Sequence, residues 1–186
     1  GQTLVQTFHG YPFKQAGMPH WRNMGFPEEK IRSYGERSRQ WDYLVSPATY
    51  ATPLLARDFG YDGEMLEIGY PRNDVLLSEE APAIRSAVRE SLGIAEDQVA
   101  VLYAPTFRDY LSPDDMRAAM VDFFDFAEAH RLLGDQVVFL VRGHAFNART
   151  AGRTDAPGTI EVTDYPEVSD LYLAADAAVV DYSSLR

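Results

Sequence analysis

The sequence contains no cysteine, and no apolar run in it is long enough to span a membrane. Without cysteine the chain cannot form disulfides or thiolate metal sites, and nothing indicates an oxidising compartment, so a cytosolic location is the default prediction. A membrane span needs about 18 consecutive apolar residues, and neither such a run nor a charged-then-apolar signal segment is present. We therefore expect any membrane contact to come from elsewhere.

Positive charge is also scarce, with 17 Lys and Arg residues against 28 Asp and Glu residues and a formal net charge of -11. A protein that grips nucleic acid or anionic lipid over a wide surface needs a broad positive field, so this charge disfavours both partners. Lysine occurs only as Lys14 and Lys30, and the remaining cations are arginines, which suit bidentate phosphate or carboxylate recognition. An anionic ligand would have to meet local arginines.

Several well-known catalytic and cofactor motifs are absent. The sequence has no Gly-x-Gly-x-x-Gly after a strand, no phosphate-loop Gly-x-x-x-x-Gly-Lys and no Gly-x-Ser-x-Gly. It also lacks Asp-x-Asp and His-x-x-x-His, the spacings that would suggest a dedicated metal site. We therefore predict neither a metal nor a cofactor.

What the sequence does contain is an alternation of buried strands and helices. With 186 residues and 46% hydrophobic content, it can form one large domain or two small ones. Short apolar runs predict strands at residues 3–8, 43–45, 65–68, 99–103, 137–141 and 177–180. Helical patterns occur at residues 48–59, 82–92, 112–127 and 166–175, the first two ending at Gly60 and Gly93. This rhythm predicts an α/β fold with parallel sheets.

A polar stretch near residues 74–81, with Asp74, Ser78, Glu79 and Glu80 and followed directly by Pro82, marks the predicted domain boundary. It divides the chain into a first piece, residues 1–78, and a second piece, residues 79–186. Both ends of the chain lie next to strand-like runs. We therefore interpret the sequence as an excised fragment.

Polar and cationic residues follow the predicted strands, at the sheet edge where open α/β sheets bind ligands. The candidates are His9, Lys14, Arg72, Thr106, Arg108, Arg142, His144, Asp181, Ser183 and Ser184. Such a set of cations in an acidic chain predicts a phosphate-bearing ligand. Each residue also has a structural interpretation, because histidines can serve as hydrogen-bonding groups, hydroxyls as helix caps and glycines as turn residues.

At these strand ends the chain resembles the CDP-glycerol glycerophosphotransferase family. Residues 8–17 resemble its Trp-His-Gly-x-Pro-x-Lys-x-x-Gly, and residues 69–74 resemble its Gly-x-Pro-Arg-Asn-Asp. Residues 103–109 are similar to its Tyr-Ala-Pro-Thr-Phe-Arg-Asp, and residues 142–144 to its Arg-x-His. Residues 168–172 and 181–184 are similar to the pair of segments that closes the family's series of motifs. The segments follow the family order across nearly the whole chain, although Phe8 replaces tryptophan and Tyr11 replaces a small hydroxyl residue.

The resemblance implies a bacterial, GT-B-like enzyme with two Rossmann-like domains facing across a cleft. It would transfer glycerol phosphate from CDP-glycerol, or from another CDP-polyol, to a glycerophosphate-primed or polymer hydroxyl and release CMP, in teichoic-acid-type cell-wall synthesis. Residues 1–78 would be the C-terminal part of the acceptor-side domain and residues 79–186 the N-terminal part of the nucleotide-donor domain. The full-length protein would act at the inner face of the cell membrane, as a peripheral protein, on a lipid-linked acceptor.

The same resemblance suggests a role for each candidate residue. His9 and His144 are the predicted catalytic residues, His9 as general base because its pKa near neutrality suits that task. Arg142 and His144 would neutralise the pyrophosphate, and Lys14 and Arg72 would meet the anionic acceptor. The other predicted donor-binding residues are Thr106, Arg108, Asp181, Ser183 and Ser184.

Two other functions share these features. A GT-B glycosyltransferase or epimerase that uses a UDP- or CDP-sugar would have the same fold and pyrophosphate site, and donor competition would distinguish it. A non-catalytic nucleotide-binding fragment would bind CMP without turning over any donor.

Overall fold

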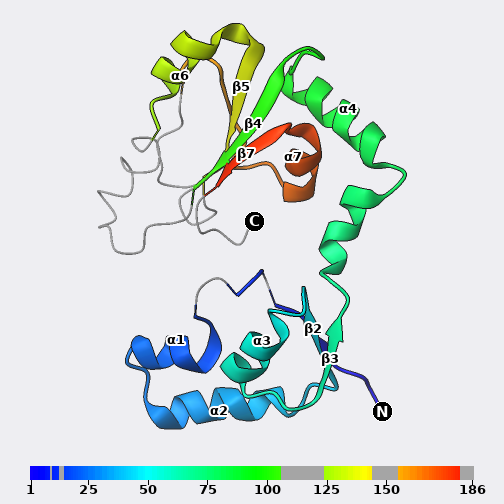
Figure 1. The fold of residues 1–186 in the computed structure, drawn as a ribbon, viewed down its shortest axis with the longest axis vertical. Helices are drawn as coiled ribbons and strands as arrows, with labels where there is room; N and C mark the ends of the chain where they lie inside the picture. The colour runs from blue at the N-terminus through cyan, green and yellow to red at the C-terminus, as the bar shows by residue number, and fades with distance from the viewer. Residues whose placement is uncertain (9, 13–14, 106–123, 144–154, 181–186) are drawn as a thin grey trace. The chain divides into compact units, whose positions relative to one another are not determined.

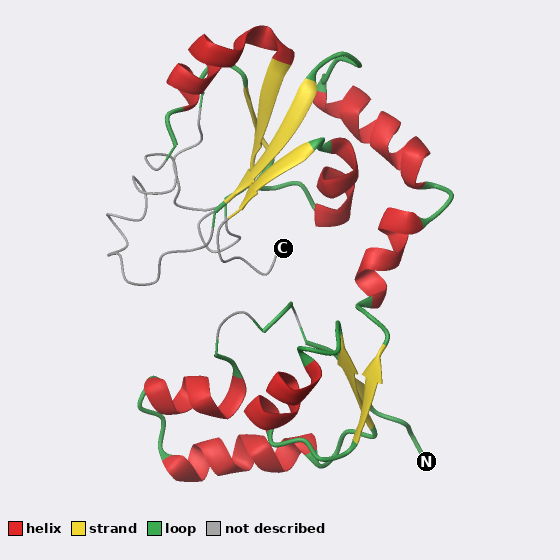
Figure 2. Ribbon diagram, in the orientation of Figure 1, coloured by secondary structure: helices red, strands yellow, loops and turns green. Residues whose placement is uncertain are grey.

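The computed structural model describes residues 1–8, 10–12, 15–105, 124–143 and 155–180. These residues separate into two compact units, unit 1 up to Asp74 and unit 2 from Val75. Each unit contains a parallel sheet connected by helices, as the strand–helix rhythm predicts (Figures 1 and 2). The α/β class with parallel sheets is confirmed. No helix in the described part of the chain combines the length and apolar character needed to cross a bilayer.

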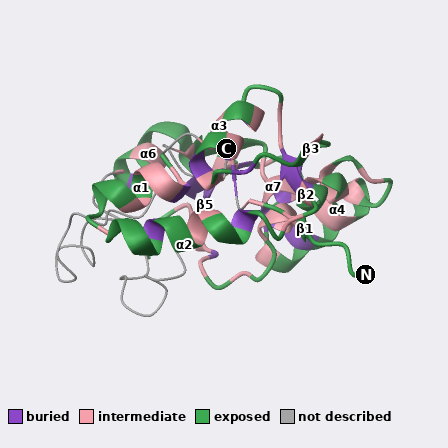
Figure 3. Ribbon diagram, turned by 90° about the horizontal axis from the view of Figure 1, so that it is seen from below, coloured by how far each residue is buried: buried purple, intermediate pink, exposed green. Residues whose placement is uncertain are grey.

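Unit 1 has a three-stranded sheet in the order β1-β2-β3, with all strands parallel. Its elements are β1 (Val5–Gln6), α1 (Gly17–Asn23), α2 (Glu28–Ser38), β2 (Tyr43–Ser46), α3 (Thr52–Phe59), β3 (Glu64–Glu67) and the 3-10 helix η1 (Pro71–Leu77), which continues into unit 2. The core is formed by Leu44, Ala51, Leu55 and Tyr61, against which Phe8, Trp41, Phe59 and Met65 pack. Figure 3 shows that β2 is the most buried part of this unit.

Strand β1 is shorter than the predicted strand at residues 3–8. The backbone N–H of Leu4 donates 2.7 Å to the Asp42 carboxylate, and the Leu4 carbonyl accepts from the N–H groups of Asp42 and Tyr43. A side chain thus replaces a ladder partner at residue 4 and limits regular pairing to residues 5 and 6.

Helices α1 and α2 were not predicted from the sequence. Neither has a side-chain N-cap, and Pro19 and Gly35 lie inside them, so the usual signals are weak. The signal that was overlooked is Pro27 followed by Glu28 and Glu29, because proline and acidic residues favour a helix start.

Unit 2 has a four-stranded parallel sheet in the order β6-β5-β4-β7. Its elements are α4 (Ala81–Leu92), β4 (Val99–Ala104), α6 (Phe126–Leu133), η2 (Gly134–Gln136), β5 (Val137–Val141), β6 (Thr159–Glu161), α7 (Val168–Ala174) and β7 (Ala177–Val180). Alternate residues of β4 and β5 point to opposite faces. One face, with Leu102 and Leu140, packs against Leu171 of α7, and the other, with Tyr103 and Phe139, packs against Phe126 of α6.

The helix ends of α3 and α4 agree with the sequence, since both helices carry proline in the first turn and stop at left-handed Gly60 and Gly93. The predicted helix at residues 112–127 lies mostly outside the described residues. What the structure describes is α6, which begins after Asp125, whose carboxylate accepts 2.8 Å from the N–H of Glu128. Strand β6 was not predicted.

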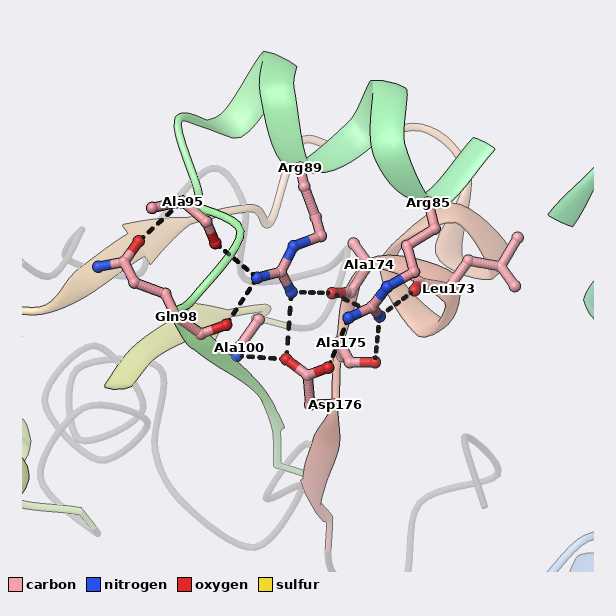
Figure 4. A network of polar contacts seen from close by, with 9 residues as sticks. All are labelled: Arg85, Arg89, Ala95, Gln98, Ala100, Leu173, Ala174, Ala175 and Asp176. Atoms are coloured by element: carbon pink, nitrogen blue, oxygen red, sulfur yellow. Dashed lines mark hydrogen bonds and ion pairs between the residues drawn. The ribbon is translucent and has the colours of Figure 1, made fainter. Parts of the chain in front are cut away.

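A charged network fixes helix α4 to the amino-terminal side of the unit 2 sheet (Figure 4). The Arg85 and Arg89 guanidiniums both contact the Asp176 carboxylate, at 2.5 and 3.1 Å, and Asp176 also accepts 2.8 Å from the N–H of Ala100. The arginines also donate to the carbonyl oxygens of Ala95, Gln98, Leu173, Ala174 and Ala175. The network thereby satisfies the last carbonyl groups of α7.

Candidate functional site

The loops that follow the strands of unit 1 share one edge of its sheet, because the strands are parallel. The loop after β1 contains Gly10 and Tyr11, and the loop after β3 contains Gly69 and Tyr70. Gly69 has a φ of 77°, a conformation that side chains rarely adopt, which explains glycine at this position. The fold therefore brings two of the sequence motifs to the same edge.

Tyr70 joins these two loops. Its hydroxyl donates a 2.9 Å hydrogen bond to the carbonyl oxygen of Gly10, and its ring meets Tyr11 edge to face with centroids 6.1 Å apart. Burial raises the pKa of Tyr70 to about 12, although the nearby Arg72 acts in the opposite direction. Tyr70 therefore stays protonated at neutral pH and holds the loop after β1 against the loop after β3.

Arg72 lies at the same edge and is exposed. Its guanidinium is 5.0 Å from the centroid of the Tyr70 ring, a cation–π arrangement. A positive charge is thereby kept beside the motif that begins at Phe8. This placement suits the predicted acceptor-side role of Arg72, which stays a prediction.

The sequence analysis missed Tyr50 and Glu67 at this edge. Tyr50 stacks on Tyr11 with centroids 6.3 Å apart and an interplanar angle of 11°. Glu67 accepts from the hydroxyls of Thr52 and Thr49 at 2.6 and 2.9 Å, and these bonds lower the pKa of its carboxyl. No local pattern marks these residues, because strand pairing alone brings them to the motif loops.

Gly17, the last residue of the first motif, has a packing role. Its φ is 54°, and a Cβ at this position would lie 2.0 Å from the carbonyl oxygen of Asp58 at the end of α3. The buried Asp58 carboxylate accepts 3.3 Å from the N–H of Ala16 and also binds Arg57. Only glycine permits this approach between the start of α1 and the end of α3.

Arg142 is fixed directly after β5 in unit 2. Its N–H donates 2.9 Å to the carbonyl of Tyr103, and its Nη1 donates to the carbonyls of Val162 and Tyr165 at 3.1 and 2.8 Å. Among the residues that the structure describes, no carboxylate pairs with Arg142, and its Nε and Nη2 groups have no hydrogen-bond partner. Neutral carbonyls thus orient a guanidinium whose charge they leave uncompensated.

Thr163 holds the residue that follows Arg142. The N–H of Gly143 donates 2.7 Å to the Thr163 hydroxyl, which in turn donates to the Glu161 carboxylate. Glu161 also accepts 3.0 Å from the N–H of Thr163. Sequence reasoning missed both residues together with β6, although the β-branched run at 159–163 after Pro157 and Gly158 is a strand signal.

Among the sequence-predicted site residues, the structure describes Arg72 and Arg142. The others lie outside the described residues: His9, Lys14, Thr106, Arg108, His144, Asp181, Ser183 and Ser184. Their roles stay predictions. Within the described ranges, no three His, Asp or Glu side chains form a group that could hold a metal ion.

The whole chain matches a known protein family. A family model described as CDP-Glycerol:Poly(glycerophosphate) glycerophosphotransferase covers residues 1–186. The teichoic acid poly(glycerol phosphate) polymerase of Staphylococcus epidermidis is 34% identical over 190 residues, covering 99% of this chain and 26% of the relative. The teichoic acid glycerol-phosphate transferase of Staphylococcus aureus is 34% identical over 191 residues, covering 98% of this chain and 48% of the relative. The chain thus spans half or less of these relatives.

Solved structures agree with the fold. The wall teichoic acid polymerase TagF superposes with a TM-score of 0.84 at 32% identity, covering 99% of this chain and 46% of that one. A variant of TagF soaked with CDPG superposes with a TM-score of 0.82 at the same identity. The α/β architecture with parallel sheets is therefore shared with these structures.

Proposed function

The chain belongs to the CDP-Glycerol:Poly(glycerophosphate) glycerophosphotransferase family, and on this premise we propose that the protein transfers glycerol phosphate from CDP-glycerol to an acceptor hydroxyl. The acceptor is a glycerophosphate-primed or polymer hydroxyl on a lipid-linked chain, and CMP is released. The names of the relatives support teichoic acid synthesis as the setting, and the CDPG-soaked TagF variant supports the donor.

The two units correspond in this proposal to the two Rossmann-like domains of a GT-B-like enzyme. Residues 1–78 belong to the acceptor-side domain and residues 79–186 to the nucleotide-donor domain. The separate parallel sheet in each unit supports this assignment. We place the full-length protein at the inner face of the cell membrane, where a lipid-linked acceptor is accessible.

The reaction forms one bond and breaks one bond. The acceptor oxygen attacks the phosphorus that carries glycerol, the bond from this phosphorus to the bridging oxygen breaks, and CMP leaves with that oxygen. His9 accepts the hydroxyl proton as general base. Positive charge at the pyrophosphate, from Arg142 and His144, stabilises the oxygens of the transferring group and of CMP.

The orientation of Arg142 is the observation that best supports this charge role. Two carbonyl bonds fix its Nη1, while Nε and Nη2 remain available, among the described contacts, as a two-donor edge suited to phosphate. The remaining predicted donor contacts, from Thr106, Arg108, Asp181, Ser183 and Ser184, add hydroxyls, a guanidinium and a carboxylate. Lys14 and Arg72 meet phosphates of the acceptor.

The proposal is tested by CMP release from CDP-glycerol by the complete protein with a glycerophosphate-primed acceptor. We expect His9→Ala to abolish transfer while largely preserving CDP-glycerol binding, and His144→Ala to damage both. His20→Ala, at an exposed histidine on α1, is the matched control and should have normal turnover. Equal, small effects of the His9 and His144 substitutions would contradict the mechanism.

Parallel assays with CDP-ribitol and UDP-sugars define the donor class. Release from a UDP-sugar in preference to both CDP-polyols would replace the proposal with a glycosyltransferase or epimerase. Tight CMP binding without release from any donor would replace it with a binding protein.

A further inference from the structure

A pocket of about 660 Å³ lies in unit 1. It is lined by Gln6, Thr7, Phe8, Trp21, Tyr34, Arg37, Trp41, Leu44, Phe59, Tyr70, Pro71 and Arg72. These residues come from strands β1 and β2, helices α1, α2 and α3, the loop before β2 and the segments that follow β1 and β3, so the pocket reaches the edge where the two motif loops meet. Its volume is in the range of small-molecule sites.

Aromatic rings form two walls of the pocket. The ring centroids of Trp21 in α1 and Tyr34 in α2 are 4.5 Å apart. The ring centroid of Phe59 is 5.4 Å from that of Phe8 and 5.9 Å from that of Trp41. These ring pairs fix one another's orientation, which favours a preformed cavity. Half of the lining side chains are aromatic, so most of what they offer a ligand is apolar surface.

The charge of the pocket is opposite to that of the chain. Arg37 and Arg72 contribute to the lining, and no acidic residue does, although the chain has 28 acidic residues and a net charge of -11. Arg37 lies with its guanidinium 4.9 Å from the centroid of the Tyr34 ring, and no carboxylate in the described part of the chain pairs with it. A ligand that fills this pocket therefore combines an apolar body with an anionic group.

A saccharide body fits this lining less well than a hydrocarbon. Sugar hydroxyls are donors that need acceptors when buried. The lining contains no Asp, Glu or Asn, and its side-chain acceptors are limited to Gln6, Thr7 and tyrosine hydroxyls. A hydrocarbon chain, in contrast, gains free energy along the aromatic walls.

We propose that this pocket binds a hydrocarbon-tailed phosphate ester, with the chain against the aromatic walls and the phosphate at Arg37. The inference rests on the proposed function, since it gives the lipid-linked acceptor a binding site in the unit that we assign to the acceptor. Phe8 lines the pocket and directly precedes His9 in the sequence. A phosphate ester bound in the pocket would therefore contact the residue next to the proposed general base.

The test is direct binding of farnesyl phosphate to the complete protein in the absence of CDP-glycerol, measured by calorimetry. Farnesol, inorganic phosphate, glycerol 3-phosphate and glucose 1-phosphate serve as comparison ligands. We expect farnesyl phosphate to bind most tightly, because only it matches both the apolar walls and the arginines. Trp21 and Trp41 are the two tryptophans of this sequence and both line the pocket, so binding should also change the fluorescence that Trp→Phe substitutions assign to them.

Two variants and one control locate the site. Arg37→Gln should weaken farnesyl phosphate binding by about tenfold or more but leave farnesol binding unchanged, because the charge-assisted hydrogen bond to the phosphate is lost. Trp21→Ala should weaken both ligands. Arg32→Gln removes the same charge from the same helix but not from the pocket and should have no effect. Circular dichroism confirms that each variant is folded.

Tighter binding of glucose 1-phosphate, equal binding of inorganic phosphate, or insensitivity to both pocket variants would overturn the inference. No binding of any ligand, as expected if another segment of the protein fills the pocket, would overturn it as well. CMP release with a soluble glycerophosphate acceptor remains measurable in each of these cases. Loss of the pocket inference is therefore distinguishable from loss of the proposed transferase activity.

Discussion

Unit 1 and unit 2 are both parallel α/β layers, but their interiors differ. Unit 2 has a core on each face of its sheet and a charged network around the buried Arg89 that fixes α4 to the sheet. Unit 1 has one described core cluster, and beside it an aromatic-lined pocket. Unit 2 thus carries Arg142 at the end of a strand whose sheet is packed on both faces, whereas unit 1 has a pocket beside its core.

The largest effect should come from Gly17→Ala in unit 1. The new Cβ would overlap the Asp58 carbonyl at 2.0 Å and would also require a left-handed backbone. We expect unit 1 to lose about 4 kcal/mol of stability, the sum of typical overpacking and left-handed costs. Tryptophan fluorescence reports on this unit, because Trp21 and Trp41 both lie in it.

Gly25→Ala is the control for this substitution, since φ is 74° but no atom lies within 4 Å of the added Cβ. It should cost only about 1 kcal/mol. If the whole far-UV circular dichroism transition shifts with the tryptophan fluorescence in Gly17→Ala, rather than splitting into two transitions, the units unfold as one body and the comparison between them fails.

Asp176→Ala should have the next largest effect and should act on unit 2. It leaves the buried Arg89 guanidinium without its carboxylate, which we expect to cost about 3 kcal/mol of stability. Urea unfolding followed by far-UV circular dichroism measures the loss. Glu128→Gln, which removes an exposed pair with Arg131, is the control and should leave the unfolding midpoint unchanged. Equal midpoints for both variants would show that the network does not stabilise unit 2.

Thr163→Val should alter turnover more than stability. It leaves the Gly143 N–H without its hydroxyl partner and so loosens the backbone next to Arg142. We expect kcat for CMP release by the complete protein to fall about tenfold, equivalent to one weakened polar contact, with little change in KM. Thr163→Ser retains the hydroxyl and should restore the rate. A melting temperature that falls in proportion to kcat would indicate a structural role only.

The smallest effect should come from acid. Burial alone would raise the pKa of Asp176, but the Ala100 N–H and the Arg85 and Arg89 guanidiniums outweigh it and lower the pKa. A depressed pKa means that the carboxylate stabilises the fold above its unfolded pKa of about 4 and loses this contribution as the pH falls through the folded value. Unit 2 should therefore weaken below about pH 4, measured by urea unfolding, and Asp176→Asn should remove part of this dependence. An unchanged pH profile in that variant would contradict the assignment.

The parts of the fold that the sequence predicted are those recorded in local patterns. Strands β4, β5 and β7 are continuous apolar runs, and α3 and α4 end at glycines. The predicted bounds of β5 and β7 equal those in the structure, those of β4 and α4 differ by one residue, and the start of α3 differs by four. Helix α1 and strand β6 were missed because they are short, and α2 was missed because Gly35 interrupts it and its start lacks a side-chain cap. The limits of β1 depend on the Asp42 side chain, 38 residues from Leu4.

The sequence by itself determined the family, the alternation of strands and helices, and the motif segments that should carry the chemistry, because residue order and spacing contain this information. Only the tertiary structure decided that Tyr70 holds Gly10, that carbonyl groups orient Arg142, and that aromatic residues from three helices and three loops line a pocket. These contacts join residues far apart in the chain. Parallel pairing and helix packing bring such residues together, and no local pattern records which partners will meet.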